Sequence, residues 1–200
     1  MKAELDKDRL ARACRLLAER LQQLGAPPLR LAVCGGSALL ALNLVNRTTR
    51  DMDIVALLDA DGQIRAPVPL PAVLLQAARD IAPLCALDEQ WLNNGPSSGE
   101  GGLFQMGLPA GFAARLHRRD YGPQLAIYFA DRRDQIFFKI YAATDRGGRH
   151  LTDLEALQPT AAELESAARW AMSLDVSENF RVLLKTMLRQ IGHDQVAEKL

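Results

Sequence analysis

The sequence predicts an α/β fold, in which helices flank a small sheet and a helical bundle follows. Short apolar runs of strand length occur at residues 31–34, 54–58 and 124–130. Segments with a helical spacing of apolar residues lie between them, and the last third of the chain has helical patterns alone. We therefore expect an α/β domain over residues 1–150, with a helical region over residues 151–200 packed on it.

The composition argues against several classes of protein. Basic and acidic residues number 24 each, so the net charge neither requires nor excludes a nucleic-acid partner, although residues 115–149 hold eight basic residues against four acidic ones. The three cysteines are widely spaced without a C-x-x-C pattern, and the three histidines are scattered. This argues against a disulfide framework and against a zinc site, and a reducing cytoplasm is the expected location.

No segment has the pattern of a signal peptide or a membrane span. The N-terminus is charged, and the longest apolar stretch, residues 31–45, is interrupted by glycines and is too short to cross a bilayer. We expect a soluble protein with no membrane partner.

The first elements are a helix, a strand and a second helix. Residues 4–24 carry apolar side chains at helical spacing, and a glycine followed by prolines ends the pattern. The strand over residues 31–34 stops at Gly35, Gly36 and Ser37, where small residues open the next helix. A tight turn is thus expected to join a strand to a helix N-terminus.

The second strand brings two acids together. It covers residues 54–58 and is entered through Asp51, Met52 and Asp53. Residues two apart in a strand point to the same face, so the carboxylates of Asp51 and Asp53 should project together while Met52 and Ile54 face the core.

This pair of carboxylates needs a compensating cation or a shared proton, because like charges repel. Mg²⁺ is the natural cation, since it binds through one or two carboxylates plus substrate phosphates. The helix N-terminus at Gly36 and Ser37 offers backbone N–H groups and the positive end of the helix dipole to such phosphates. The two halves therefore suit a metal-bound nucleoside triphosphate.

The middle of the chain is predicted to contain a helix, a loop and two more strands. The helix covers about residues 71–87 and is entered through prolines. Residues 93–111 hold six glycines and two prolines, and this loop is either a lid over substrate or a tolerated insertion. Strands at residues 113–117 and 124–130 follow, and then a buried helix at residues 134–144.

The C-terminal region is predicted to form a small helical bundle. Thr160 with Glu163, and Asp175 with Glu178, match the capping-box pattern that begins a helix. The apolar residues at helical spacing that should be buried are Leu164, Ala168, Ala171, Phe180, Leu183, Leu184 and Met187.

The glycine turn and the paired acids resemble a known signature. The turn at residues 35–37, a spacer of thirteen residues and D-M-D-I at residues 51–54 are similar to the motif of the DNA polymerase β-type nucleotidyltransferase superfamily. FKIYAA at residues 138–143, a basic loop and HLTDL at residues 150–154 are similar to a segment of AbiEii/MenT-like toxin nucleotidyltransferases and their uncharacterised relatives. The two matching segments cover roughly a third of the chain.

This resemblance implies a nucleotidyltransferase-like small mixed sheet with flanking helices, and an enzyme that moves a nucleoside monophosphate from an NTP to an acceptor hydroxyl. It implies Mg²⁺ or Mn²⁺ held by Asp51 and Asp53, an acceptor such as tRNA and an antitoxin protein as a possible partner. The catalytic residues that it implies are Asp51, Asp53, Lys139 and Asp153. The nucleotide-binding residues are Gly35, Gly36 and Ser37, to which we add Arg47.

Several of these residues also have a purely structural interpretation. Lys139 follows two phenylalanines on its helix, where a lysine can lie along the surface and keep its head group in water. Asp153 can be a first-turn acid that the helix dipole favours. Four arginines either contact phosphate or RNA or are solvated loop charges: Arg47, Arg50, Arg146 and Arg149.

A third carboxylate, which many members of the superfamily place on a later strand, is absent from residues 124–130 and is only approached by the flanking Asp120 and Asp131. AbiEii/MenT-like members resemble this arrangement and rely on the later lysine and aspartate. The alternative function is a non-catalytic nucleotide- or partner-binding protein that retains the fold.

Overall fold

The computed structural model describes residues 4–99 and 101–200, and the chain divides into two compact units, Met1–Asp131 and Arg132–Leu200. The described residues form a six-stranded mixed sheet and ten α-helices, which confirms the predicted α/β class. The sheet lies in the first unit. The division that we expected at residue 150 leaves helix α6 (Arg132–Arg146) with the sheet, whereas the first compact unit ends just before this helix.

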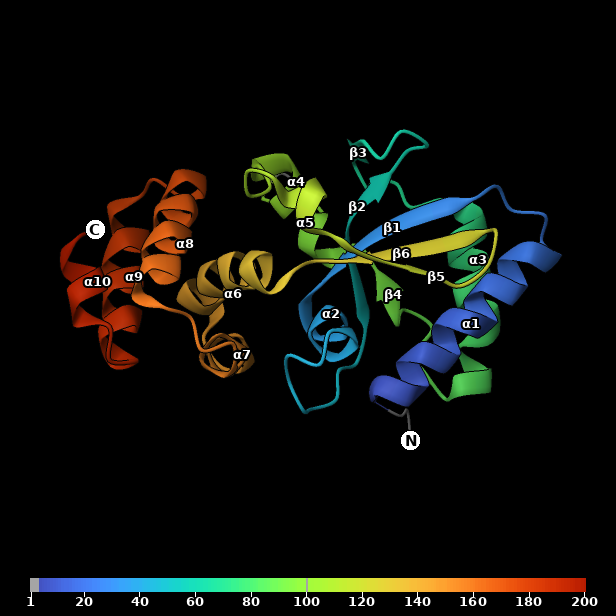
Figure 1. Ribbon diagram of the computed structural model, residues 1–200, viewed down its shortest axis with the longest axis horizontal. Helices are drawn as coiled ribbons and strands as arrows, with labels where there is room; N and C mark the ends of the chain where they lie inside the picture. The colour runs from blue at the N-terminus through green and yellow to red at the C-terminus, as the bar shows by residue number, and fades with distance from the viewer. Residues whose placement is uncertain (1–3, 100) are drawn as a thin grey trace. The chain divides into compact units, whose positions relative to one another are not determined.

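The sheet is built around strand β1 (Leu29–Cys34), which runs parallel to β6 (Leu125–Phe129) and antiparallel to β2 (Met52–Leu58) (Figure 1). The strand order is β3-β2-β1-β6-β5, with β3 at Ile64–Arg65 and β5 at His117–Asp120. Strand β4 (Leu92–Asn93) pairs with the beginning of β2. The two predicted strands 31–34 and 54–58 are thus the neighbouring central strands, each a few residues longer than the apolar run.

One face of the sheet is covered by helices α1 (Lys7–Gln23), α2 (Gly35–Ala41) and α3 (Ala72–Ile81), whose apolar side chains form one core with the strands. Leu31 and Val33 of β1 lie in this core, and so do Ile127 and Phe129 of β6. Because strand residues alternate in direction, the residues between them belong to the opposite face. We call these the helix-covered face and the second face.

Helix α1 begins where a side chain caps it. Asp6 accepts a hydrogen bond of 2.8 Å from the backbone N–H of Arg9, which satisfies one of the unpaired donors at the helix start. The predicted stripe of Leu10, Cys14 and Leu17 is buried. The helix that we predicted over residues 71–87 is shorter: α3 ends at Ile81, and Pro83–Cys85 form a 3₁₀ turn, because proline cannot donate the next helical hydrogen bond.

The glycine-rich segment between β4 and β5 contains short elements rather than a plain loop. They are a 3₁₀ turn at Gly95–Ser97, α4 (Leu103–Met106) and α5 (Phe112–Arg115). The Ser97 hydroxyl donates a 2.8 Å hydrogen bond to the Val55 carbonyl, which anchors the segment on β2. The strand predicted at residues 113–117 is wrong, because β5 starts at His117, where it finds its pairing partner Phe129.

The second unit consists of α6, α7 (Arg149–Ala156), α8 (Ala161–Leu174), α9 (Glu178–Gln190) and α10 (Asp194–Glu198). The predicted buried helix at residues 134–144 is confirmed as part of α6. Its aromatic side chains gather around the Trp170 ring, with ring centroids 5.5–6.3 Å from it: Phe137, Phe138 and Tyr141.

The two predicted capping boxes have different outcomes. Thr160 and Glu163 form the expected reciprocal pair at the start of α8. At α9 the prediction is wrong, because Ser177 is the capping residue and Asp175 accepts from the Ser177 backbone N–H instead. Leu183 was expected in the bundle core but is 45% exposed, while the other predicted core residues are buried.

The described cysteines, Cys14, Cys34 and Cys85, are all buried and form no disulfide. In the part of the chain that the structure describes, no helix is both long enough and apolar enough to cross a membrane. The described range also contains no group of three or more His, Cys, Asp and Glu side chains arranged to hold a metal ion.

Candidate functional site

The two acids of the first motif lie at the start of β2. Asp51 immediately precedes the strand and Asp53 is its second residue, and both side chains are half-buried. Met52 and Ile54 are fully buried in the core. The predicted alternation is therefore confirmed within the strand, where Met52 and Ile54 face the helices and Asp53 belongs to the second face. That Asp51 projects together with Asp53 stays a prediction.

Asp53 lies against the glycine turn. Its backbone is paired with Cys34, the last residue of β1, and Gly35 follows directly. Gly35 has a left-handed φ of +69°, and a Cβ atom added to it would come within 2.8 Å of the Asp53 Oδ2 atom. Only glycine gives both this backbone conformation and this close approach.

Gly36 is also tightly packed, in this case against the loop that follows α2. A Cβ atom there would overlap the Thr49 hydroxyl and would lie 3.3 Å from Nη1 of Arg47. The same Nη1 atom donates a 2.6 Å hydrogen bond to the Thr48 carbonyl. The loop that leads to Asp51 thus packs onto the turn, and the Arg47 guanidinium lies beside the start of α2.

Ser37 contributes in a different way. Its side chain is fully buried, and its hydroxyl donates a 3.3 Å hydrogen bond back to the Cys34 carbonyl. The hydroxyl therefore holds the turn together. Contact with a phosphate at this place would come from the backbone N–H groups of the first turn of α2.

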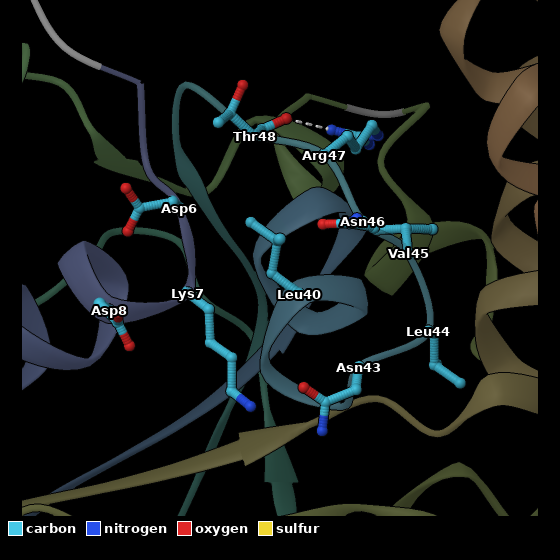
Figure 2. A pocket seen from close by; sticks show the side chains of 10 residues that line it. All are labelled: Asp6, Lys7, Asp8, Leu40, Asn43, Leu44, Val45, Asn46, Arg47 and Thr48. Atoms are coloured by element: carbon cyan, nitrogen blue, oxygen red, sulfur yellow. Dashed lines mark hydrogen bonds between the residues drawn. The ribbon is translucent and has the colours of Figure 1, made fainter.

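An open pocket of about 830 Å³ lies between the start of α1 and the loop after α2. Figure 2 shows Arg47, with its hydrogen bond to Thr48, on that loop. The pocket is lined by two carboxylates, two cations, and amide and apolar groups. The lining residues are Asp6, Lys7, Asp8, Leu40, Asn43, Leu44, Val45, Asn46, Arg47 and Thr48. The volume of the pocket is in the range of small-molecule sites.

The strand on the other side of β1 supplies no third acid. On β6 the second-face positions are Ala126 and Tyr128, which pair with Arg30 and Ala32 of β1. The flanking acids are engaged elsewhere: Asp131 lies 3.1 Å from Nε2 of His117, and Asp120 binds Arg118.

Lys139 and Asp153 form a buried ion pair in the second unit. The Lys139 Nζ atom of α6 is 2.7 Å from Oδ2 of Asp153 on α7, and the side chains are only 6% and 1% exposed. The interpretation of Lys139 as a surface lysine is therefore wrong. So is that of Asp153 as a first-turn acid, because it lies in the second turn of α7. A cleft shared with Asp51 stays a prediction.

The other three arginines that were considered as phosphate or RNA contacts lie on exposed loops or helix ends. Arg50 is 3.7 Å from Glu4, Arg146 is 3.6 Å from its neighbour Asp145, and Arg149 is exposed at the start of α7. Arg47 is the arginine for which a position beside the glycine turn is shown.

Sequence reasoning missed two residues that border this site. Thr49 is buried against Gly36, and no local pattern marks it, because residues 46–51 are all polar. Asn93 of β4 pairs in register with Asp53 and so shares its face. No local pattern marks Asn93, because its pairing is between distant segments.

In chemical terms, the first unit offers two half-buried carboxylates, a glycine turn at a helix start and an arginine within one small region. Such a region can bind a phosphorylated ligand together with a cation. Comparison with protein-family models, with curated proteins and with solved structures found no match.

Proposed function

We propose that this protein is a magnesium- or manganese-dependent nucleotidyltransferase of the DNA polymerase β type. It would move a nucleoside monophosphate from an NTP to an acceptor hydroxyl and release pyrophosphate. The observation that carries the proposal is the contact between the Asp53 carboxylate and the Gly35 turn. This contact brings a carboxylate that can bind a metal ion next to a helix start that can bind phosphate. A metal-bound triphosphate requires both groups.

The two aspartates suit a divalent metal. Mg²⁺ commonly binds through one or two carboxylates and completes its coordination with substrate phosphates and water, so Asp51 and Asp53 are a sufficient protein contribution. When bound, the metal would neutralise phosphate charge and make the acceptor hydroxyl easier to deprotonate.

The chain's own groups would hold the rest of the nucleotide. Backbone N–H groups of Gly36 and Ser37 would bind the outer phosphates, and the Arg47 guanidinium beside Gly36 would add a fixed positive charge. In the transfer, the acceptor oxygen bonds to the α-phosphorus and the bond between the α- and β-phosphates breaks. By the sequence resemblance, Lys139, which is paired with Asp153, would neutralise charge that develops on the triphosphate.

The acceptor and partners follow from the sequence resemblance. Among AbiEii/MenT-like toxins the acceptor that we favour is tRNA, and an antitoxin protein would be the natural partner in a cytoplasmic setting. The basic excess between residues 115 and 149 suits such an acceptor.

A second candidate is a non-catalytic protein that binds a nucleotide or a partner. The observation that favours it is the second face of β6, where Tyr128 stands and no carboxylate is available. Such a protein would bind NTP at the glycine turn without transferring it.

The deciding experiment is label transfer from each α-³²P-labelled NTP, with Mg²⁺ or Mn²⁺ and total RNA. Asp53→Asn is the test variant, and Asp61→Asn, in the exposed turn after β2, is the matched control. We expect label on RNA with the wild type and with Asp61→Asn but not with Asp53→Asn. Binding of NTP without any transfer would favour the second candidate.

A further inference from the structure

Arg118 and Tyr128 form a stack on the second face of the sheet. The Arg118 Cζ atom lies 5.8 Å from the centroid of the Tyr128 ring, and these residues are paired across β5 and β6. The Asp120 carboxylate fixes the guanidinium with contacts of 2.9 Å to Nε and 2.8 Å to Nη2. Arg118 is 58% exposed although it is held on both sides.

The side chains next to Tyr128 on this face of the sheet are small. The strand neighbours on the same face are Ala126 along β6 and Ala32 across β1, both of which have only a methyl side chain. Arg30, which pairs with Ala126, adds a second cation at the margin. Both alanines are buried and Tyr128 is half-buried, so the exposed group of this cluster is the Arg118 guanidinium.

The stack lies on the same face as Asp53, one of the proposed catalytic acids. Tyr128 pairs with Ala32, which is two residues before Cys34, the partner of Asp53. In a regular sheet this amounts to roughly 7 Å along the strands and roughly 10 Å across them. A chain of a few nucleotides can span that separation.

We propose that the Arg118–Tyr128 stack docks an unpaired base of a single-stranded RNA acceptor, an inference that rests on the proposed function. Unstacked RNA bases are bound on aromatic rings and on guanidinium planes, and both are present here in one rigid unit. Arg30 and Arg118 complement backbone phosphates. Asp120 provides an oxygen that can accept a hydrogen bond from a ribose 2′-hydroxyl, which DNA lacks.

An extended protein segment is the competing occupant of this part of the sheet. Such a segment would pair with the backbone of β5, the outermost strand on its side, and would make little use of the Tyr128 ring. The exposed guanidinium over an aromatic ring favours a flat π-system such as a base. The choice is decided by whether affinity for RNA depends on that ring.

The test is fluorescence anisotropy of a labelled single-stranded RNA of about twelve nucleotides with the full chain in EDTA and without NTP. We expect Tyr128→Ala to weaken binding about tenfold, and Tyr128→Phe to leave it unchanged. Arg118→Gln should weaken binding several-fold. Arg65→Gln on β3, which removes an arginine that also binds an aspartate through Nε and Nη2, should have no effect.

Three results would overturn the proposal: no RNA binding by the wild type, equal affinity for DNA of the same sequence, or affinity indifferent to both Tyr128→Ala and Arg118→Gln. If Tyr128→Ala fails to fold, the exposed Arg118 variant decides. Because binding is measured without metal and NTP, RNA binding that is retained while transfer is absent would count against the proposed function alone.

Discussion

The ammonium of Lys139 lies 2.7 Å from the carboxylate of Asp153, and both groups are withdrawn from water inside the second unit. Removing one partner of a buried pair leaves the other charge without compensation. We expect Lys139→Met to lower the free energy of unfolding by about 3–5 kcal/mol. Lys185→Met, at a half-exposed position on α9, should change it by less than about 0.5 kcal/mol. Urea unfolding of the two variants checks this.

The same pair allows its structural and functional roles to be separated. In the double variant Lys139→Met with Asp153→Leu, apolar side chains replace both charges, and stability should return to within about 1–2 kcal/mol of the wild type. Nucleotidyl transfer should remain lost. Transfer at the wild-type rate in the folded double variant would reduce the pair to a structural element.

The aspartates at β2 are predicted to matter for chemistry and not for stability. Asp51→Asn or Asp53→Asn should reduce transfer at least about a hundredfold, which corresponds to about 3 kcal/mol of transition-state stabilisation. The melting temperature should be unchanged or slightly raised, because a like charge is removed. Activity assays and thermal unfolding of each variant are the measurements. Normal transfer by the double variant would mean that the metal assignment is wrong.

The Gly35 turn can be tested with a matched glycine. Gly35 and Gly62 both have a left-handed φ, +69° and +77°, but a Cβ atom meets Asp53 at Gly35 and nothing within 4 Å at Gly62. Each alanine variant should lose about 1–2 kcal/mol of stability from the backbone alone. Gly35→Ala should in addition displace the carboxylate and reduce transfer about a hundredfold. Equal activity of the two variants would contradict the proposed role of the contact.

Glu163 should make the second unit sensitive to acid. Its hydrogen bonds from Arg132, with those from Thr160, lower the pKa of the carboxyl from 4.5 to about 2. A carboxyl whose folded pKa is depressed stabilises the fold above its unfolded pKa, and this contribution is lost as the pH falls from 4.5 towards 2. Because the side chain is partly exposed, we expect Glu163→Gln to cost about 1 kcal/mol at pH 7.

The check is urea unfolding of Glu163→Gln and the wild type between pH 7 and pH 2. The difference in unfolding free energy should shrink below pH 4.5. Glu178→Gln, which removes an exposed acid 3.8 Å from Arg181, is the control and should show little difference at any pH. A difference for Glu163→Gln that stays constant down to pH 2 would show that its charge is not involved.

The parts of the molecule that follow from local rules were predictable. The strand, the glycine turn, α2 and the alternation of Met52, Asp53 and Ile54 all depend on neighbouring residues, and the structure has them as expected. The approach of Asp153 to Lys139 was also anticipated, from a resemblance and the short loop between their helices.

The parts that depend on distant pairing or on competition between equal signals were not predictable. Strand β5 begins at His117 because β6 ends opposite it, and Asn93 lies beside Asp53 through the two-residue strand β4. At α9, Asp175 and Ser177 are both good capping residues, and only the geometry shows that Ser177 fills that place. The place of Tyr128 on the face of Asp53 likewise required the register of three strands.

The most direct measurement of the central claim is a crystal structure of the protein with a non-hydrolysable NTP analogue and Mg²⁺. The account predicts a metal ion bound by oxygens of Asp51 and Asp53 at about 2.0–2.1 Å. It also predicts outer phosphates on the backbone N–H groups of Gly36 and Ser37, with the Arg47 guanidinium beside them. A nucleotide bound elsewhere, for example only in the pocket of Figure 2, with no metal on the two aspartates, would contradict it.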